Sequence, residues 1–342
     1  MRIGPVDLET RVLVVAEIGN NHEGDVALAE RMVREAAGAG ADAVKLQTFR
    51  TEAYVTPAET RRFDQLKRFE LGDPAVARLA DLARAAGVLF LTTPFDLESV
   101  DVVAPWVPAF KIASGDLTVP ALLGRVAAKG KPMILSTGMA VPDEIEEALA
   151  LIRAATPGPL VDRVALLHCV SSYPTPADQA NLRSIPFLRE RFGLTVGYSD
   201  HTLGTLAAVA AVALGARIVE KHFTYRREGQ TFGDHQLSAE PAEFADMVRR
   251  IRQVERLRGA YDKVCQPAEE PVRQVARRSL AAARPLSRGA TIDEDDLTWL
   301  RPATGIPPKD QARVVGRTLT RDIAAGAVLT WDDLGGVETG AG

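Results

Sequence analysis

Two segments of the chain end a short apolar run with side chains that can do chemistry. TVGYSDHT presents Ser199 and His201, and RIVEKHFT presents Glu220 and His222. Two neutral imidazoles from neighbouring strands can share a divalent cation through their ring nitrogens. Because neither segment supplies a third strong ligand, coordination positions would stay open for water and substrate, as Lewis-acid catalysis requires. The segments therefore predict a metal site at His201 and His222, against the alternative of two unrelated histidines.

A second set of residues is cationic and rich in hydroxyl groups. Lys45 lies in AVKLQTF and Lys111 in FKIASGD, each within an otherwise apolar run. Lysine is rarely buried unless it is paired or functional. With the hydroxyls of Thr93, Ser114 and Ser199, the two ammonium groups would suit a ligand that bears a phosphate and a carboxylate. The alternative is that both lysines are only structural ion-pair partners.

Two carboxylates complete the set of chemically capable residues. Glu17, in VVAEIGNNHEGD, is a candidate acid or base, and Glu220 is a second carboxylate that could bind a polyol hydroxyl. A phosphorylated carboxylate on one side and a metal that polarises a carbonyl on the other favour a condensation. Its donor would be an enol that bears phosphate.

These residues must be positioned by the apolar runs that they follow. Five of the runs come after an Ala-rich helical stretch that ends near a glycine, a typical stop signal for a helix. The runs are continuously apolar rather than alternating, as in strands buried on both faces of a parallel sheet. Eight such runs are found at 12–19, 43–47, 88–92, 109–115, 132–137, 164–170, 194–199 and 217–223.

Helical patterns separate most of these runs. They lie at 25–39, 74–86, 118–129, 142–154, 178–191 and 203–214, and a last one at 241–258 follows the eighth run. This alternation predicts a (β/α)8 barrel, with a doubly wound open sheet as the alternative. Because the carboxyl ends of barrel strands meet at one mouth, and all five histidines fall at or just beyond strand ends, we expect a catalytic mouth there. The longer connection 51–72 would sit on its rim.

The pattern changes after about residue 260. We expect the catalytic barrel to span 1–262, a polar, proline-containing linker to span 263–276, and a small turn-rich domain to span 277–337. That domain contains an internal echo, because ARPLSRGATIDEDDL (283–297) resembles TRDIAAGAVLTWDDL (320–334). A domain of about 60 residues usually needs support from a partner surface.

The composition excludes several classes of protein. The 342 residues are 46% hydrophobic and 25% charged, which is typical of a globular chain. A net charge of −4 without any basic run argues against a nucleic-acid or membrane partner. With only Cys169, expected to be a packed core thiol, and Cys265, a disulfide framework is not expected. No signal peptide or apolar span is evident, so we expect a cytoplasmic protein.

The motifs, taken in order, are similar to those of a known family. AEIGNNHEGD, AVKLQTF, TTPFD, KIASGD, ILSTGM, YPTP, GYSDHT and EKHFT occur in this order in the sialic acid synthases. That family includes N-acetylneuraminate, legionaminate, pseudaminate and spore-coat polysaccharide synthases. The resemblance covers nearly the whole chain, and the C-terminal segment resembles the antifreeze-like (SAF) domain. It implies a (β/α)8 barrel that condenses phosphoenolpyruvate with an N-acylated amino-hexose and water, giving a 2-keto-3-deoxy sugar acid and phosphate.

The resemblance also implies roles for individual residues. His201 and His222 match metal ligands, usually for Mn²⁺, with Mg²⁺ or Co²⁺ as alternatives. Contacts to phosphoenolpyruvate match Lys45, Thr93, Lys111, Ser114 and Ser199. Positions near the sugar and the reacting centre match Glu17, Gln47, Asp116, Tyr173, Glu220 and Asp234. The residues expected to take part in catalysis are Glu17, Lys111, Tyr173 and Glu220. Arg301, in WLRPATG, matches an arginine that the SAF domain of one subunit inserts over the barrel mouth of the other, which implies a domain-swapped homodimer.

Four departures from the family pattern leave the acceptor sugar open. The segment 51–72 looks shorter than in well-known members, and Ser171 stands where some members have Asn. Asp116 replaces a Glu found in some members, although Asp is common among the spore-coat-type relatives, and TFGDHQLSAEP differs from the usual sequence after the eighth strand. One alternative is a related synthase that acts on a phosphorylated aldose, for which Arg61 and Arg62 could bind the second phosphate. A metal-dependent amidohydrolase on the same barrel and a non-enzymatic carbohydrate-binding protein are more remote alternatives.

Overall fold

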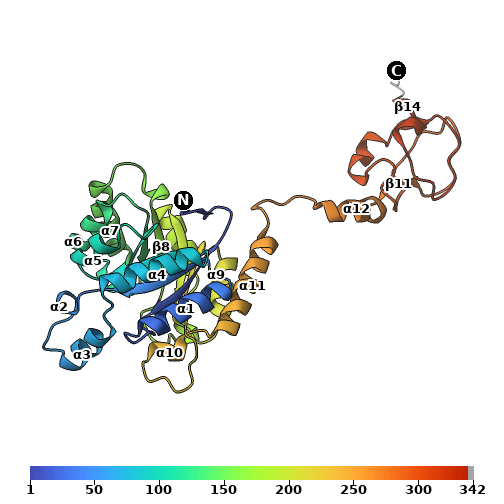
Figure 1. Cartoon of the computed structure of the whole chain (residues 1–342). Coiled ribbons are helices and arrows are strands. Elements are labelled where there is room, and N and C mark those ends of the chain that lie inside the picture. Colours follow the sequence, from blue (N-terminus) through green and yellow to red (C-terminus); the bar gives the residue numbers. More distant parts are fainter. Residues whose placement is uncertain (338–342) are drawn as a thin grey trace. The chain divides into compact units, whose positions relative to one another are not determined.

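The computed structural model describes residues 1–337 of the chain (Figure 1). It divides into two compact units, Met1–Gly259 and Ala260–Gly342. Each unit has its own hydrophobic core, and each is described by itself below.

The first unit is built on eight parallel strands that form a barrel. Their order in the sheet is β5-β4-β3-β10-β9-β8-β7-β6, and the two ends of this order, β5 and β6, lie next to each other. This confirms the predicted (β/α)8 barrel over the doubly wound alternative. The strands are β3 Leu13–Gly19, β4 Ala43–Thr48, β5 Leu89–Pro94, β6 Phe110–Ile112, β7 Met133–Ser136, β8 Val164–His168, β9 Thr195–Asp200 and β10 Ile218–His222.

Helices connect the strands and cover the outside of the barrel. They are α1 Val26–Gly38, α2 Thr51–Tyr54, α3 Thr60–Phe69, α4 Asp73–Ala85, α5 Leu97–Val103, α6 Pro120–Ala127, α7 Pro142–Ala155, α8 Ser184–Phe192, α9 Leu206–Ala213, α10 Asp234–Leu237 and α11 Pro241–Arg258. The short 3-10 turns are η1 Ser114–Asp116, η2 Leu160–Asp162 and η3 Ala177–Gln179. The expected glycine stops are present; for example, Gly193 ends α8 with a φ of 65°.

Sequence patterns missed four helices of the first unit, namely α2, α3, α5 and α10. Between β5 and β6 the chain forms α5, whose N-cap Asp96 accepts a hydrogen bond from the backbone N–H of Ser99 at 2.8 Å. The helix is only seven residues long, which is too short for a clear 3.6-residue period.

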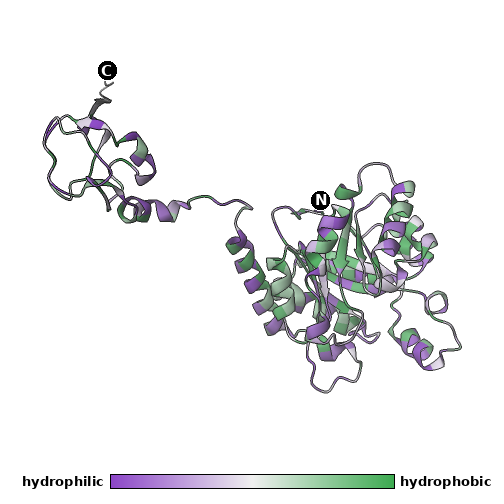
Figure 2. Ribbon diagram, turned by 180° about the vertical axis from the view of Figure 1, so that it is seen from behind, coloured by the Kyte–Doolittle hydropathy of each residue, from purple (hydrophilic) through white to green (hydrophobic). Residues whose placement is uncertain are grey.

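The barrel interior has an apolar half and a polar half. At the amino ends of the strands, inward residues such as Leu13, Leu91 and Ile218 pack into one buried cluster. Ile3 and Leu8 join this cluster from the N-terminal hairpin of β1 Arg2–Ile3 and β2 Val6–Asp7. The hairpin therefore closes the amino end of the barrel. The hydrophobic character of the strands appears in Figure 2, where they are mainly green. The polar inward residues gather at the carboxyl ends.

The second unit contains two small antiparallel sheets. Its elements are η4 Pro267–Glu269, α12 Glu270–Ala276, β11 Ser279–Ala282, β12 Leu297–Leu300, η5 Pro308–Arg313, β13 Arg317–Leu319, η6 Trp331–Asp333 and β14 Leu334–Val337. The two similar sequence segments also form similar structures. Arg284 donates to the carboxylate of Asp296 at 2.7 Å, and Arg321 donates to that of Asp333 at 2.5 Å. These pairs occupy equivalent positions of the two echoed segments.

Across residues 1–337, the structure contains no helix that is long and apolar enough to cross a membrane.

Candidate active site

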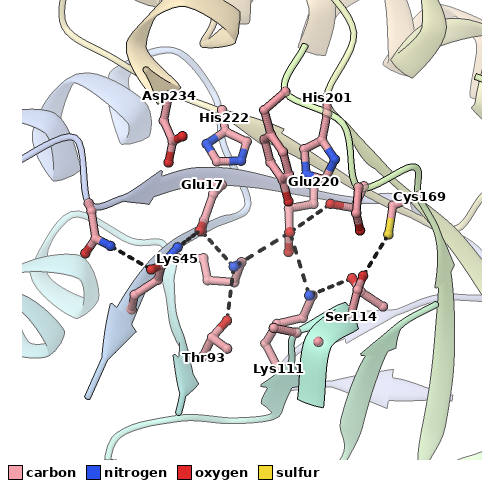
Figure 3. Close-up of a pocket in the computed structure, with 18 of the residues that line it drawn as sticks. Glu17, Lys45, Thr93, Lys111, Ser114, Cys169, His201, Glu220, His222 and Asp234 are labelled. Carbon is pink, nitrogen blue, oxygen red and sulfur yellow. Dashed lines mark hydrogen bonds and ion pairs between the residues drawn. The ribbon is translucent and has the colours of Figure 1, made fainter. Parts of the chain in front are cut away.

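The polar half of the barrel opens into a cavity of about 560 Å³ at the carboxyl ends of the strands (Figure 3). Nearly all residues singled out from the sequence line it. These are Glu17, Lys45, Gln47, Thr93, Lys111, Ser114, Asp116, Tyr173, Ser199, His201, Glu220, His222 and Asp234. Arg301 does not line it, because it belongs to the second unit, where its side chain is exposed. Arg61, His22, His168 and His235 also lie outside the cavity lining, so only two of the five histidines expected at the mouth reach it.

The floor of the cavity holds two lysines and two glutamates. Lys45 Nζ lies 2.8 Å from Glu17 Oε2 and 3.6 Å from Glu220 Oε1, and Lys111 Nζ lies 3.8 Å from Glu220 Oε1. Ser199 donates a hydrogen bond to Glu220 at 3.0 Å. All four charged side chains are buried. Buried ionic groups persist only when they are paired, and these four are paired with one another rather than through a ligand.

The cations also contact neutral oxygens. Lys45 donates to Thr93 Oγ1 at 3.2 Å, and Lys111 donates to Ser136 Oγ at 2.7 Å and to the carbonyl of Ile112 at 3.1 Å. Hydroxyls can rotate to donate to an incoming anion. The floor is therefore suited to an anion with several acceptor oxygens.

The two glutamates of the floor differ in proton affinity. Burial, together with the charge of Glu220, raises the pKa of Glu17 to about 7 against the opposing effect of Lys45. Burial also acts on Glu220, but Lys111 and Lys45 outweigh it and lower the pKa of that carboxyl. Glu220 is thus ionised at neutral pH, whereas Glu17 can exchange a proton there, as a general acid or base must.

The two lysines of the floor also differ in proton affinity, and Lys111 has the lower one. The charges of Glu17 and Glu220 outweigh burial and raise the pKa of Lys45, whereas burial lowers the pKa of Lys111 despite Glu220. An anion bound near Lys111 would favour its protonated form and so offset the effect of burial.

His201 and His222 meet on one side of the cavity. Their ring centroids lie 5.5 Å apart, and the ring of Tyr173 lies 4.2 Å from that of His201. His201 Nδ1 bonds the carbonyl of Val170 at 2.8 Å, which makes Nδ1 the protonated nitrogen and leaves the Nε2 lone pair free. His222 Nδ1 is buried and has no hydrogen-bond partner among the described residues.

These two rings fit a metal site with open positions. Burial lowers the pKa of both His201 and His222, so both are neutral at pH 7 and their lone pairs are available. Within residues 1–337, no group of three or more His, Cys, Asp or Glu side chains is arranged to hold a metal ion. A cation there would therefore take its remaining ligands from water or substrate.

A glycine and a cysteine that sequence reasoning did not connect with the site contact Ser114, and the cysteine itself lines the cavity. Ser114 Oγ accepts from the backbone N–H of Gly138 at 3.0 Å and lies 3.1 Å from Cys169 Sγ. A Cβ on Gly138 would lie 2.4 Å from Ser171 Oγ and 2.8 Å from Ser114 Oγ. Cys169 is buried as expected, but it faces the cavity rather than only the core.

The outer part of the cavity carries two further carboxylates. Burial raises the pKa of Asp116 to about 6, partly offset by Lys111, and that of Asp234 to about 6, partly offset by Arg62. Asp116 Oδ2 is buried without a hydrogen-bond partner among the described residues. A carboxylate oxygen in this state calls for a ligand that donates a hydrogen bond.

The outer wall also contains three aromatic residues that sequence reasoning did not single out. The segment 51–72 reaches the cavity through Tyr54 of α2 and through Arg62 of α3, as expected for a rim segment. Phe95 and Phe232 complete this wall. Phe95 lies within the motif TTPFD but carries no group that could do chemistry, and Tyr54 and Phe232 lie outside the strand-end motifs.

The comparisons with known proteins agree with this architecture. Residues 32–263 match the model of the NeuB family, and residues 277–335 match that of the SAF domain. The chain is 37% identical over 335 residues to N,N'-diacetyllegionaminic acid synthase of Legionella pneumophila, covering 94% of each chain. It is 33% identical over 319 residues to N-acetylneuraminate-9-phosphate synthase of Mus musculus, covering 89% of this chain and 87% of the mouse protein.

A solved structure gives the same result. The N-acetylneuraminic acid synthetase of Leptospira borgpetersenii, crystallised with citrate, superposes with a TM-score of 0.75 at 34% identity, over 80% of this chain and 94% of that one. Eight strand ends that converge on one cavity, a SAF unit and relatives that include legionaminic, pseudaminic and N-acetylneuraminate-9-phosphate synthases point to one identification. The chain is an enzyme that belongs to the NeuB family of sialic acid-type synthases and carries a C-terminal SAF domain.

Proposed function

We propose that the protein is a nonulosonic acid synthase that condenses phosphoenolpyruvate with the open-chain aldehyde of an N-acylated amino-hexose. The products are a 2-keto-3-deoxy sugar acid and phosphate. The observation that supports this best is the juxtaposition, in one cavity, of a buried two-lysine floor and two neutral imidazoles. The floor suits the anionic donor, and the imidazoles lie beside it on the way to the opening.

The donor fits the floor by charge. Phosphoenolpyruvate carries a phosphate and a carboxylate, and Lys45 and Lys111 supply two cations with hydroxyls beside them. Charge-assisted hydrogen bonds of this kind are about twice as strong as neutral ones. Binding the donor would exchange part of the lysine–glutamate pairing for lysine–anion pairing, and Glu17 with its raised pKa can take up a proton as that happens.

The imidazoles of His201 and His222 are the residues that would hold a divalent cation such as Mn²⁺, with Mg²⁺ or Co²⁺ as alternatives. When bound, the cation would act as a Lewis acid toward the aldehyde oxygen of the acceptor. Tyr173, whose ring lies 4.2 Å from that of His201 at an interplanar angle of 37°, would limit how the acceptor approaches the rings.

The carbon chemistry requires proton transfer by the protein. The new bond joins C3 of phosphoenolpyruvate to the aldehyde carbon, whose oxygen becomes a hydroxyl, while positive charge develops at C2. Water adds at C2 and gives up one proton, which balances the proton taken up by the aldehyde oxygen. The resulting C2 hydroxyl then loses its proton to the departing phosphate as the C2 carbonyl forms. Glu17 would accept the proton of the attacking water, because its pKa of about 7 leaves a large ionised fraction at neutral pH. Glu220, ionised throughout, would keep the lysines in place and accept a hydroxyl of the sugar.

The deciding experiment measures phosphate release from phosphoenolpyruvate with Mn²⁺, across a panel of N-acyl-mannosamines and diamino-trideoxy-hexoses. We expect release only when an acceptor is present, and a loss of at least about a hundredfold in the double variant His201→Ala/His222→Ala. His168→Asn is the control, because His168 lies outside the cavity and bonds the carbonyl of Ala180. No release with any acceptor, or full release by the double variant, would contradict the proposal.

The same proposal includes a domain-swapped homodimer in which Arg301 of one subunit covers the barrel mouth of the other. It is supported by exposed aromatic and apolar surface beside that arginine, because Trp299 is 46% exposed and Leu300 is 38% exposed on the same strand, β12. Such residues are typical of an interface.

A further inference from the structure

Behind the two imidazoles lies an ion pair that does not face the cavity. Asp200 on β9 and Lys221 on β10 are register partners in the parallel ladder, and Lys221 Nζ lies 3.0 Å from Asp200 Oδ2. Their side chains are 0% and 1% exposed. Because successive side chains of a strand point to opposite faces, Ser199 and Glu220 face the cavity, whereas the ion pair faces the surrounding helices.

The remaining polar atoms of this pair bond the residue that follows His201. Asp200 Oδ1 accepts from the backbone N–H and from the hydroxyl of Thr202, both at 2.8 Å. Lys221 Nζ donates to the carbonyl of Thr202 at 2.5 Å. The residues on both sides of His201 are thus tied to Lys221, the residue immediately before His222.

This network lies where the ladder between β9 and β10 ends. The last register pair of that ladder is Asp200–Lys221, so His201 is the first residue beyond it. The segment that follows β8 also holds this stretch, because the N–H of Thr175 donates to the carbonyl of His201 at 2.9 Å and Thr175 forms a β-bridge with Thr202. The Asp200–Lys221 pair holds Thr202 from the other side, and it is the connection that joins the backbone next to His201 to the strand that bears His222.

Stability alone is a poor explanation for such a pair. Removing two charges from water costs several kcal/mol, and well-packed apolar residues of similar volume often stabilise a protein as well or better. The best-attested benefit of a buried ionic group is that it fixes one arrangement among several. Here, the ion pair would fix the position of His201 relative to His222.

We propose that Asp200 and Lys221 are positioning residues that set the separation and direction of His201 and His222. This inference rests on the proposed metal site. Residues that orient metal ligands from behind usually change metal affinity by about 10- to 100-fold when they are altered.

The test measures Mn²⁺ binding to the full-length protein without substrates, by calorimetry or by electron paramagnetic resonance of free Mn²⁺. We expect Lys221→Met and Asp200→Asn each to weaken Mn²⁺ binding by about tenfold or more. The matched control is Arg252→Met, which removes a part-buried cation that pairs with Asp42 near the amino ends of the strands. It should lower the thermal midpoint but change Mn²⁺ affinity by less than about twofold, because distant sites act independently.

Two results would overturn the inference. One is a folded Lys221→Met protein with wild-type Mn²⁺ affinity, and the other is an equal loss of affinity in the Arg252→Met control. If both charge variants fail to fold, Thr202→Val decides, because it keeps the ion pair and removes only one hydrogen bond. We expect it to weaken Mn²⁺ binding by about threefold, in keeping with the loss of one such bond, and an unchanged affinity would count against the positioning role.

Failure of the metal site itself would look different. If the wild-type protein binds no divalent cation, the metal part of the proposed function is wrong. The positioning role is then read from crystal structures, in which the ring centroids of His201 and His222 should move apart or turn in a variant that folds, relative to their 5.5 Å separation. Rings that stay in place would refute it.

Discussion

At the scale of single residues, the floor of the cavity is organised by the different proton affinities of its two glutamates. Burial leaves Glu17 with a pKa of about 7, whereas the lysines keep Glu220 ionised. Because the charge of Glu220 helps to raise the pKa of Glu17, the carboxyl that stays ionised favours the proton on the other.

The first prediction concerns the pH dependence that follows from Glu17. If Glu17 accepts the proton of the attacking water, it must be ionised, so turnover should rise with pH through about 7. Glu17→Gln should remove this rising limb and lower kcat by about a hundredfold or more, within the usual range for a general base. The measurement is kcat against pH for both proteins, with Mn²⁺ binding checked at each pH. Near wild-type turnover with metal binding intact would exclude this role.

The second prediction concerns the acceptor. Asp116 and Asp234 line the outer cavity as carboxylates, and Asp116 Oδ2 has no donor among the described residues. Sugar hydroxyl and amide groups donate hydrogen bonds, but a phosphate dianion only accepts them and would be repelled. We therefore expect an unphosphorylated amino-hexose to have a kcat/KM at least about tenfold above that of its phosphate ester. Equal values would show that Arg62 offsets both carboxylates.

Two variants test whether the carboxylates or Arg62 decide between the unphosphorylated and the phosphorylated acceptor. Asp234→Asn keeps the shape of the side chain and removes one charge, so it should raise the relative kcat/KM of the phosphorylated acceptor. Arg62→Ala should lower the relative kcat/KM of the phosphorylated acceptor below its wild-type value. A wild-type protein that prefers the phosphorylated acceptor, and loses that preference in Arg62→Ala, would favour the alternative in which the acceptor is phosphorylated.

How far the site could be predicted from the sequence depends on where each residue lies. Lys45, Glu220 and His222 follow apolar runs, and the geometry of a parallel barrel brings strand ends together without further information. Tyr54 and Phe232 come from connections whose paths depend on packing, which no period in the sequence encodes. The sequence also left Asp200 without a role. Its contacts depend on which face of β9 it lies on, and the sequence does not show that this face is the one away from the cavity.

At the scale of elements, the end of β7 shows how a backbone position can limit a binding site. Gly138 follows this strand, donates to Ser114 Oγ, and has no room for a methyl group beside Ser171 and Cys169. The third prediction is that Gly138→Ala displaces Ser114 and raises the KM for phosphoenolpyruvate by about tenfold, the cost of about one hydrogen bond to a charged group.

Another glycine provides a matched control for this change. Gly124 lies within α6, and a Cβ there would meet no atom within 4 Å. Gly124→Ala should leave the KM unchanged and stabilise the protein by about 0.5–1 kcal/mol, because alanine favours a helix. Steady-state kinetics and thermal unfolding of both variants check the pair. A wild-type KM in Gly138→Ala would show that Ser114 does not contact the donor.

The elements themselves were predicted best where their patterns are long. Eight continuous apolar runs were enough to indicate the barrel, and α1 and α7 have clear helical periods. The N-terminal hairpin and α5 are too short to show a period, and they form because they cover apolar surface that only the folded barrel presents.

At the scale of the whole molecule, the fourth prediction tests whether one subunit completes the site of another. Arg301 and Glu17 belong to different units of the same chain. Arg301→Ala and Glu17→Gln should each inactivate a homodimer, whereas mixed dimers contain one site in which both residues are native. We expect mixing under exchange conditions to restore up to about a quarter of wild-type activity, because the two chains pair at random in dimers of this kind.

The outcome that contradicts this arrangement is equally clear. If Arg301 acts within its own chain, every site in the mixture lacks one of the two residues, and mixing restores nothing. The separately prepared variants, measured at the same total protein concentration, provide the baseline.

The apolar hairpin that closes the amino end of the barrel has a kinetic consequence. With Ile3 and Leu8 filling that end, every reactant must enter, and every product must leave, through one opening. The donor floor lies deepest, so an acceptor bound first would block the way to it. We expect an ordered sequential mechanism in which phosphoenolpyruvate binds before the sugar. Initial-rate and product-inhibition patterns would reveal the order, and a random order would mean that the opening widens further than the static cavity suggests.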